Sequence, residues 1–214
     1  VRNGLSIDGR ARLDRSERLW FEYAPGSEHQ MLTGGPDSEV WLTYDHSSYY
    51  VELGMDDYLT LTIDANTNVH GEGYVGSWGT STQQATTLIN KGRIGADSSG
   101  YLRVRPETLI NQGVMDANGS NARLEISSSS FENAGEVEID NGGQLYLNTN
   151  MDNTGTVDIN NGYLYMNAAQ TTADLGTVNV GPSGQFSIRS TLDNSGEVLD
   201  FGASTVRMYN GTIV

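Results

Sequence analysis

The sequence predicts an all-β protein: a right-handed, single-stranded parallel β-helix, or β-solenoid, with about 20 residues per coil. A turn glycine returns at nearly constant intervals, the residues after it alternate between apolar and polar, and a second apolar tripeptide returns with the same period. A repeat of this length is typical of solenoids, in which each coil buries its apolar face against its neighbours. The right hand is expected from the general chirality of parallel crossovers.

The first repeated element surrounds the turn glycine. It reads LINKGRI at 88, LINQGVM at 109, FENAGEV at 131, MDNTGTV at 151, TADLGTV at 172 and LDNSGEV at 192. Successive glycines are therefore separated by 21, 22, 20, 21 and 20 residues. The second residue after each glycine is apolar and its neighbours are mainly polar, which predicts a strand with one buried face. These apolar residues are Ile94, Met115, Val137, Val157, Val178 and Val198.

The second repeated element lies between the glycines. It reads LRV at 102, LEI at 124, LYL at 145, LYM at 164, FSI at 186 and VRM at 206, and it alternates in the same way. Each coil should therefore contain at least two short strands that face one interior. The residues predicted to lie inside include Val137, Ile139, Leu145, Leu147, Val157, Ile159, Leu164 and Met166.

An asparagine stands two positions before most of the turn glycines. We expect these amides to stack and hydrogen-bond from coil to coil at a corner, where glycine accommodates a positive φ. The predicted corner residues are Asn90, Gly92, Asn111, Gly113, Asn133, Gly135, Asn153, Gly155, Asn194 and Gly196. In the fifth repeat Asp174 replaces the asparagine and Thr172 takes the apolar position, so that corner should be the weakest.

The chain divides into two parts by regularity. Residues 69–214 carry the regular repeats, whereas residues 1–68 contain strand-like segments separated by uneven turns. We interpret residues 1–68 as irregular β coils of the same rod with longer corners. The alternative is a small separate β domain that ends near Asp64.

The repeats resemble those of a known group of proteins. The segments GEGYVGSW, TTLINKGRIGAD, LINQGVMDANG, FENAGEVEI, MDNTGTVDI and LDNSGEV resemble the L-x-N-x-G-x-I repeats of large secreted bacterial β-helix surface proteins, which include filamentous-haemagglutinin-like and autotransporter-like adhesins. The resemblance covers about residues 69–214. It implies a segment of a secreted protein at the bacterial cell surface, with a structural or adhesive role in a stalk or fibre and no enzymatic activity.

The composition narrows the classes of partner. The net charge of −15 argues against binding to nucleic acid or to an anionic membrane, and it favours cations or neutral sugars. The absence of cysteine excludes disulfides, thiol catalysis and thiolate zinc sites. No run approaches the ~18 apolar residues of a membrane span, so membrane insertion is not expected.

Outward-facing acidic residues form one candidate site. The residues are Asp116, Glu138, Asp140 and Asp158, and asparagines occupy neighbouring outward positions. Carboxylate and amide oxygens on stacked strands could hold Ca²⁺, which takes 6–8 oxygen ligands. This is the one cofactor that the sequence suggests. The alternative is a solvated acidic face that prevents lateral aggregation.

Three tyrosines form a second candidate site. Tyr146 and Tyr165 are the middle residues of successive strands and should stack on the outside, with Tyr163 nearby. Exposed aromatic pairs can bind the sugar rings of surface glycans. The alternative is a cross-strand aromatic pair that supports the sheet.

A β-helix polysaccharide-binding protein, or a polysaccharide lyase or hydrolase, is the alternative function. Such an enzyme needs long corner loops and paired acidic groups, and the short corners between residues 88 and 207 leave only residues 8–58 for them. The acids and the histidine there have no recognisable spacing, so no catalytic residue is predicted; they are Asp8, Asp14, Glu22, Asp37, Asp45 and His46. We interpret all three histidines, His29, His46 and His70, as surface polar residues.

Both ends of the chain read as open coils. VRNGLSIDG already has the pattern of a coil strand and turn, and STVRMYNGTIV ends on an apolar strand. An unshielded strand edge invites pairing with a further strand. The expected partners are therefore more β-helix of the same chain or head-to-tail copies of this one.

Overall fold

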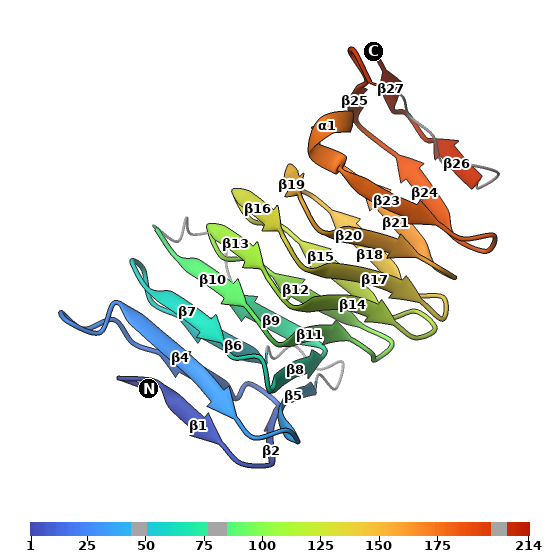
Figure 1. The fold of residues 1–214 in the computed structure, drawn as a ribbon. Helices are drawn as coiled ribbons and strands as arrows, with labels where there is room; N and C mark the ends of the chain where they lie inside the picture. Colours follow the sequence, from blue (N-terminus) through green and yellow to red (C-terminus); the bar gives the residue numbers. More distant parts are fainter. Residues whose placement is uncertain (44–50, 77–84, 198–204) are drawn as a thin grey trace.

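The protein, in a computed structural model that describes residues 1–43, 51–76, 85–197 and 205–214, is a parallel β-helix (Figure 1). Every strand pair in these ranges is parallel, and successive coils stack in register along the rod. The predicted fold class is confirmed. Val198, Asp45 and His46, which the sequence analysis singled out, lie outside the described residues.

Each regular coil contributes three strands, one to each of three sheets. The first sheet contains β1 (Leu5–Ile7), β4 (His29–Gly34), β7 (Thr60–Ile63), β10 (Thr87–Asn90), β13 (Thr108–Asn111), β16 (Ser130–Asn133) and β19 (Met151–Asn153). The second contains β2 (Arg10–Asp14), β5 (Ser38–Thr43), β8 (Thr67–Gly71), β11 (Arg93–Ala96), β14 (Val114–Asn118), β17 (Glu136–Asp140), β20 (Thr156–Ile159) and β23 (Thr177–Val180).

The third sheet carries the tripeptides that lie between the glycines. It contains β3 (Arg18–Phe21), β6 (Glu52–Met55), β9 (Gly73–Gly76), β12 (Tyr101–Val104), β15 (Arg123–Ile126), β18 (Gln144–Leu147), β21 (Tyr163–Met166), β24 (Gln185–Ile188) and β26 (Thr205–Met208). A small fourth sheet near the C-terminus contains β22 (Gln170–Thr171), β25 (Thr191–Asp193) and β27 (Thr212–Ile213).

The core is a continuous apolar column inside the coils. Val137 on β17 lies opposite Val157 on β20, and Leu145 on β18 lies opposite Leu164 on β21. Because side chains alternate along a strand and equivalent residues stack, every second residue points into the column. All eight residues predicted to lie inside are buried, which confirms this part of the prediction.

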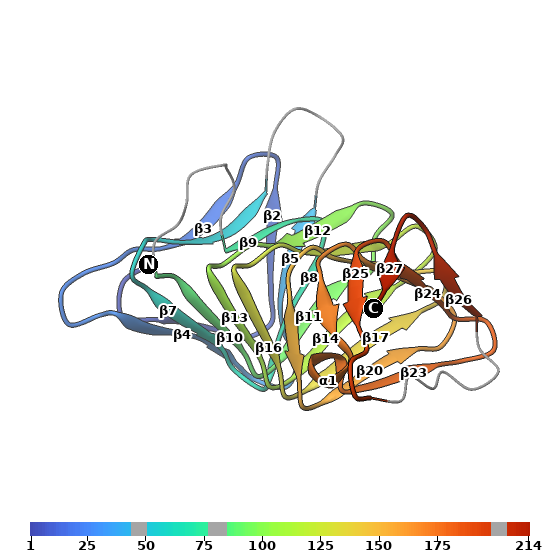
Figure 2. The ribbon, with the colours of Figure 1, turned by 90° about the horizontal axis from the view of Figure 1, so that it is seen from above.

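The N-terminal coils join the same sheets as the regular repeats. β7 pairs with β10, β5 with β8 and β6 with β9, so the three ladders cross residue 68 without a break. The corner from β3 to β4 has seven residues, whereas the equivalent corners from β12 to β13 and from β15 to β16 have three. In Figure 2 the blue loop that precedes β4 extends beyond the neighbouring coils at the left. Uneven corners therefore change the outline of the rod while its ladders continue.

The corner of the fifth repeat departs from the others. A single helical turn, α1 (Thr172–Leu175), replaces the regular corner, and the Thr171 hydroxyl caps it by accepting a 3.0 Å hydrogen bond from the Asp174 amide. Leu175 is buried and occupies the interior. The first sheet ends at β19, one coil before this turn, and the fourth sheet begins at β22, which directly precedes it. The departure thus occurs at the repeat in which aspartate replaces asparagine.

Strand edges stand at both ends of the rod. β1, β2 and β3 are terminal strands of the three main sheets, and β26 and β27 are terminal strands at the other end. Met208, Ile213 and Val214 expose much of their apolar surface there. Across the described ranges, no helix has the length and apolar character that a membrane crossing requires.

Candidate functional site

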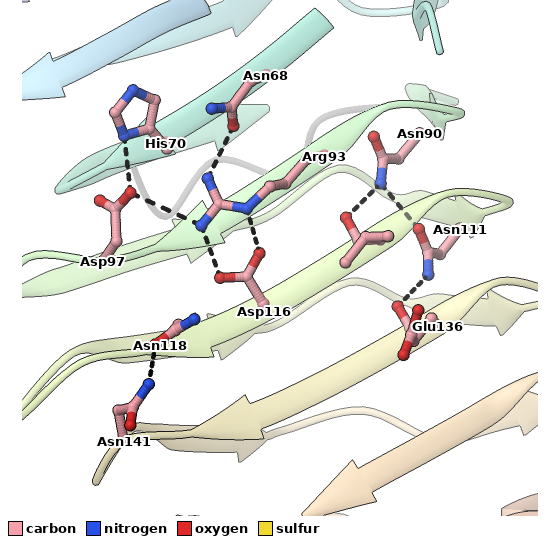
Figure 3. Close-up of polar contacts among 11 residues, drawn as sticks. Asn68, His70, Asn90, Arg93, Asp97, Asn111, Asp116, Asn118, Glu136 and Asn141 are labelled. Carbon is pink, nitrogen blue, oxygen red and sulfur yellow. Dashed lines mark hydrogen bonds and ion pairs between the residues drawn. The ribbon is translucent and has the colours of Figure 1, made fainter. Parts of the chain in front are cut away.

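The first structural feature of interest is a chain of buried asparagine amides at one corner (Figure 3). Asn90 Nδ2 donates to Asn111 Oδ1 at 2.8 Å, and Asn111 Nδ2 donates to Asn133 Oδ1 at 2.7 Å. Asn133 continues the chain to Asn153 at 2.7 Å. Each of these four amides also donates to a backbone carbonyl oxygen, as Asn111 does to Glu136. The amides therefore join both the side chains and the backbones of successive coils.

The amide chain begins and ends within the rod. Ile63 occupies the position of the asparagine in the preceding coil, and Asn90 Oδ1 is buried with no hydrogen-bond partner. At the other end, Asn153 Nδ2 donates to the Leu175 carbonyl oxygen at 2.7 Å. Asn194 lies outside the chain: its Oδ1 accepts from the Thr172 hydroxyl, and its amide donates to a backbone carbonyl three residues on. The prediction that Asn194 extends the ladder is wrong, because α1 interrupts the corner.

The corner glycines are required by close backbone approach and not by a positive φ. Gly92, Gly113, Gly135 and Gly155 all have φ values outside the left-handed region, so the expectation of positive φ is wrong for them. A Cβ at Gly135 would collide with the carbonyl oxygen of Gly113, and the other three meet the preceding coil in the same way. Positive φ occurs at Gly176 and Gly196, in the less regular repeats.

The outward face of the second sheet carries a compact charged cluster (Figure 3). Arg93 Nε lies 2.5 Å from one carboxylate oxygen of Asp116, and Nη2 lies 2.8 Å from the other. Arg93 also donates to Asn68 at 2.9 Å and lies 3.6 Å from Asp97. Because residue 95, opposite Asp116, is a glycine, the arginine side chain can fold over it to reach the next coil.

His70 extends this cluster toward the N-terminal coils. Its Nδ1 lies 2.9 Å from Asp97 Oδ2, and its Nε2 lies 3.2 Å from Glu39 Oε2. The imidazole ring is parallel to the Trp41 ring, with 6.0 Å between centroids. The interpretation of His70 as a surface polar residue did not include its contacts with Glu39 and Asp97. The uneven corners of these coils hide the strand register in the sequence, and in that register His70 lies opposite Trp41.

The carboxylates of this cluster have different acidities. Burial raises the pKa of Asp116, and the hydrogen bond and charge of Arg93 counteract only part of this effect. Burial also opposes the ionisation of Asp97, but the hydrogen bond and charge of His70, with the charge of Arg93, outweigh it and lower its pKa. The cluster therefore holds two carboxylates whose pKa values are shifted in opposite directions.

The acidic residues suggested for calcium follow the same ladder. Asp116 is held by a guanidinium group, Asn160 donates to Glu138 at 3.5 Å, and Asn179 donates to Asp158 at 2.7 Å. In the part of the chain that the structure describes, no group of three or more His, Asp or Glu side chains is placed to hold a metal ion. The carboxylates are arranged in a row instead of converging on one point, and calcium binding there stays a prediction.

The outward face of the third sheet carries the tyrosines. The Tyr146 and Tyr165 rings lie 4.8 Å apart between centroids, and the Tyr163 ring is nearly parallel to that of Tyr165 at 6.2 Å. Tyr101 adds a further ring 6.2 Å from Tyr146. Tyr146 and Tyr165 are neighbours as predicted, but their planes are tilted by 33° instead of being parallel. The row of rings is longer than the sequence indicated, because the first residues of some strands also face outward.

Arginines stack on these tyrosines. Arg103 and Arg123 lie over the Tyr101 ring at 4.3 and 4.8 Å, and Arg189 lies over the Tyr165 ring at 3.8 Å. Neither Arg123 nor Arg189 was predicted from the sequence to lie at this face. Both could have been found in the sequence, because each arginine stands next to an apolar strand residue at a position where the alternation along the strand predicts an outward side chain.

A hollow lies on this face near the C-terminal end of the third sheet. Its volume is about 390 Å³, and its lining includes Tyr165, Gln185, Ser187, Arg189, Arg207 and Tyr209. Aromatic and charged side chains with a small polar floor are suited to a polar ligand that carries a ring.

Comparison with known proteins gives no relative. No family model matches this chain, and neither a curated protein nor a solved structure matches it.

Proposed function

We propose that this chain is a non-enzymatic structural and adhesive segment of a secreted bacterial surface protein or extracellular fibre. The observation that carries the proposal is the strand register, which is kept from coil to coil in three ladders and reinforced by the buried asparagine chain. A structure of this kind can be lengthened by adding coils without changing its cross-section. Such a rod can act as a spacer that presents its outer faces.

The third-sheet tyrosines are the proposed adhesive surface. Tyr146, Tyr163 and Tyr165 present neighbouring rings on two consecutive strands of a rigid sheet. Because strands hold the rings, little conformational freedom is lost when a sugar ring packs against them. Surface glycans are therefore the proposed partners of this face.

The proposed partners at the ends of the rod are other β-helix coils. The terminal strands β26 and β27 carry exposed apolar residues beside strand edges. A further coil, from the same polypeptide or from a head-to-tail copy, would pair with these edges and cover the apolar residues. Light scattering over a range of concentrations tests the second of these partners, since a mass that does not change with concentration would contradict head-to-tail association.

An adhesion experiment tests the proposed function. Beads coated with the 214-residue chain should be retained under flow on immobilised glycans more strongly than beads coated with albumin. Tyr146→Ser and Tyr165→Ser should reduce retention, whereas Tyr23→Ser, at an exposed tyrosine of the N-terminal part, should leave it unchanged. Equal retention of chain-coated and albumin-coated beads would contradict an adhesive role.

Polysaccharide binding with cleavage is the second candidate function. The observation that favours it is the position of His70 between Glu39 and Asp97, beside Arg93, because acid–base catalysis uses a histidine oriented by carboxylates. The test is the release of new reducing ends from polysaccharides incubated with the chain. Activity that His70→Ala abolishes would favour an enzyme, and activity that survives this change would exclude His70 as the acid–base group.

A further inference from the structure

The hollow on the third sheet results from one small residue in a row of large ones. Tyr165, Ser187 and Arg207 are direct ladder neighbours on β21, β24 and β26, and all three face outward. Because Ser187 is much shorter than the residues on either side, a hollow remains above it, and Ser187 itself lies nearly buried at the floor. Arg189 and Tyr209, the residues that directly follow β24 and β26, border the same space.

Arg189 is positioned as a binding group. Its guanidinium carbon lies 3.8 Å from the Tyr165 ring centroid and 5.5 Å from that of Tyr209, so the group is held between two rings. Among the described residues its buried Nε has no hydrogen-bond partner, as is also the case for the Nε atoms of Arg105 and Arg123. A buried, unpaired N–H of a charged group is unfavourable, and a ligand that accepts a hydrogen bond there would remove this cost.

The charge around the hollow is opposite to that of the whole chain. The chain carries a net charge of −15, yet the described residues that line the hollow include two arginines and no carboxylate. Glu125, the nearest acidic position in the same column of the sheet, is already engaged by Arg103 and Arg105. The hollow is therefore a local positive site on an acidic rod, which would attract an anion.

We propose that this hollow binds a saccharide that carries a carboxylate or sulfate group. The apolar face of the sugar ring would pack on the tyrosines, and the anionic group would accept hydrogen bonds from Arg189 and Arg207, whose planar guanidinium groups match two oxygens at once. The amide of Gln185 and the hydroxyl of Ser187 would contact ring hydroxyls at the floor. This inference rests on the proposed adhesive function and specifies the ligand class of one site.

Titration calorimetry at low ionic strength tests the proposal. The probes are a glucuronate-containing hexasaccharide, its sulfated derivative and a neutral glucose hexamer. At least one anionic probe should bind about tenfold or more tightly than the neutral probe, and its binding should weaken as NaCl is added. Which anionic probe binds better distinguishes carboxylate from sulfate. Equal affinity for neutral and anionic probes, or no binding of either, would overturn the proposal.

Two arginine variants and a matched control locate the site. Arg189→Gln and Arg207→Gln should each weaken binding of the anionic probe about tenfold, because each removes a charge-assisted hydrogen bond. Arg123→Gln is the control, since Arg123 stacks on Tyr101 in the same sheet but does not line the hollow. An equal loss in all three variants would mean that the charge of the face, and not this hollow, binds the ligand.

A filling variant separates this inference from the proposed function. Ser187→Tyr would continue the row formed by Tyr146 and Tyr165, so we expect a folded protein with an unchanged or higher melting temperature but no binding of the anionic probe. If this variant still binds the probe, the hollow is not the site. If the hollow is not the site, retention of beads coated with Ser187→Tyr on neutral glycans would still support the adhesive role, because the surface formed by Tyr146 and Tyr165 is unchanged in this variant.

Discussion

The side-chain amide of Asn111 lies 2.7 Å from the carbonyl oxygen of the Asn133 side chain, one coil farther along, and both residues are buried. Asn133 in turn donates to Asn153, so it is an interior member of the amide chain. We expect Asn133→Ala to lower the free energy of unfolding by about 1–3 kcal/mol, because it removes the side-chain acceptor of Asn111 Nδ2 and the side-chain donor to Asn153 Oδ1 in the interior. Denaturant unfolding measures this loss.

The control for this prediction is Asn118→Ala. Asn118 lies on the outward side of β14 and accepts a hydrogen bond from Asn141 at the surface, so its loss should cost well under 1 kcal/mol. Losses of the same size at residues 118 and 133 would contradict a structural role for the buried amide chain.

Gly135 tests the close approach of the coils. Gly135→Asn should destabilise the protein by about 1–3 kcal/mol or prevent folding, because its Cβ would collide with the Gly113 carbonyl oxygen. Gly142→Asn is the matched control: its φ is 83°, a conformation that asparagine adopts readily, and the space around it is open. If Gly142→Asn cost as much as Gly135→Asn, close contact with the preceding coil would not be the reason for glycine at position 135.

Removal of Arg93 should expose the cost of burying Asp116. Arg93→Met leaves a buried carboxylate without its two hydrogen bonds, and we expect a loss of about 2–4 kcal/mol at neutral pH. Burial raises the pKa of Asp116, so its protonated form favours folding, and this contribution is lost as the pH rises through the folded-state pKa. The loss caused by Arg93→Met should therefore shrink as the pH is lowered toward that pKa. A loss that is independent of pH would contradict this explanation.

Glu138 should be a destabilising residue at neutral pH. Burial and the adjacent carboxylates, Glu136 first, raise its pKa above the ordinary value of 4.5. The protonated form thus favours folding, and this stabilisation is present below the ordinary pKa and is lost as the pH rises through the raised value. We expect Glu138→Gln to stabilise the protein by about 0.5 kcal/mol at pH ~7. The gain should disappear in acid, and a gain that persists at low pH would point to a cause other than charge.

Calcium and sodium salts distinguish a metal site from screening. If the row of Asp116, Glu138, Asp140 and Asp158 binds Ca²⁺, millimolar CaCl₂ should raise the melting temperature more than NaCl of the same ionic strength. If screening of like charges is the sole effect, the two salts should act alike. Equal shifts would eliminate the calcium hypothesis.

Much of the fold was predictable because the coils repeat. Where the coil length is nearly constant, alternation along each strand determines which residues stack, and Val137 and Val157 become neighbours for that reason alone. The amides of Asn90, Asn111 and Asn133 were predictable in the same way. The interruption at α1 was signalled by Asp174, but the helical turn itself was not, since four residues carry too little periodicity to identify a helix.

The sequence alone determined the period, the buried face of each strand and the column in which each outward residue lies. The tertiary structure decided which partners those outward residues choose. Arg93 reaches across a coil to Asp116, His70 meets carboxylates from two other strands, and a hollow opens above Ser187 between larger neighbours. The physical reason is that burial of the apolar column follows from pattern, whereas contacts between long side chains depend on rotamers and on corner lengths that no repeat specifies.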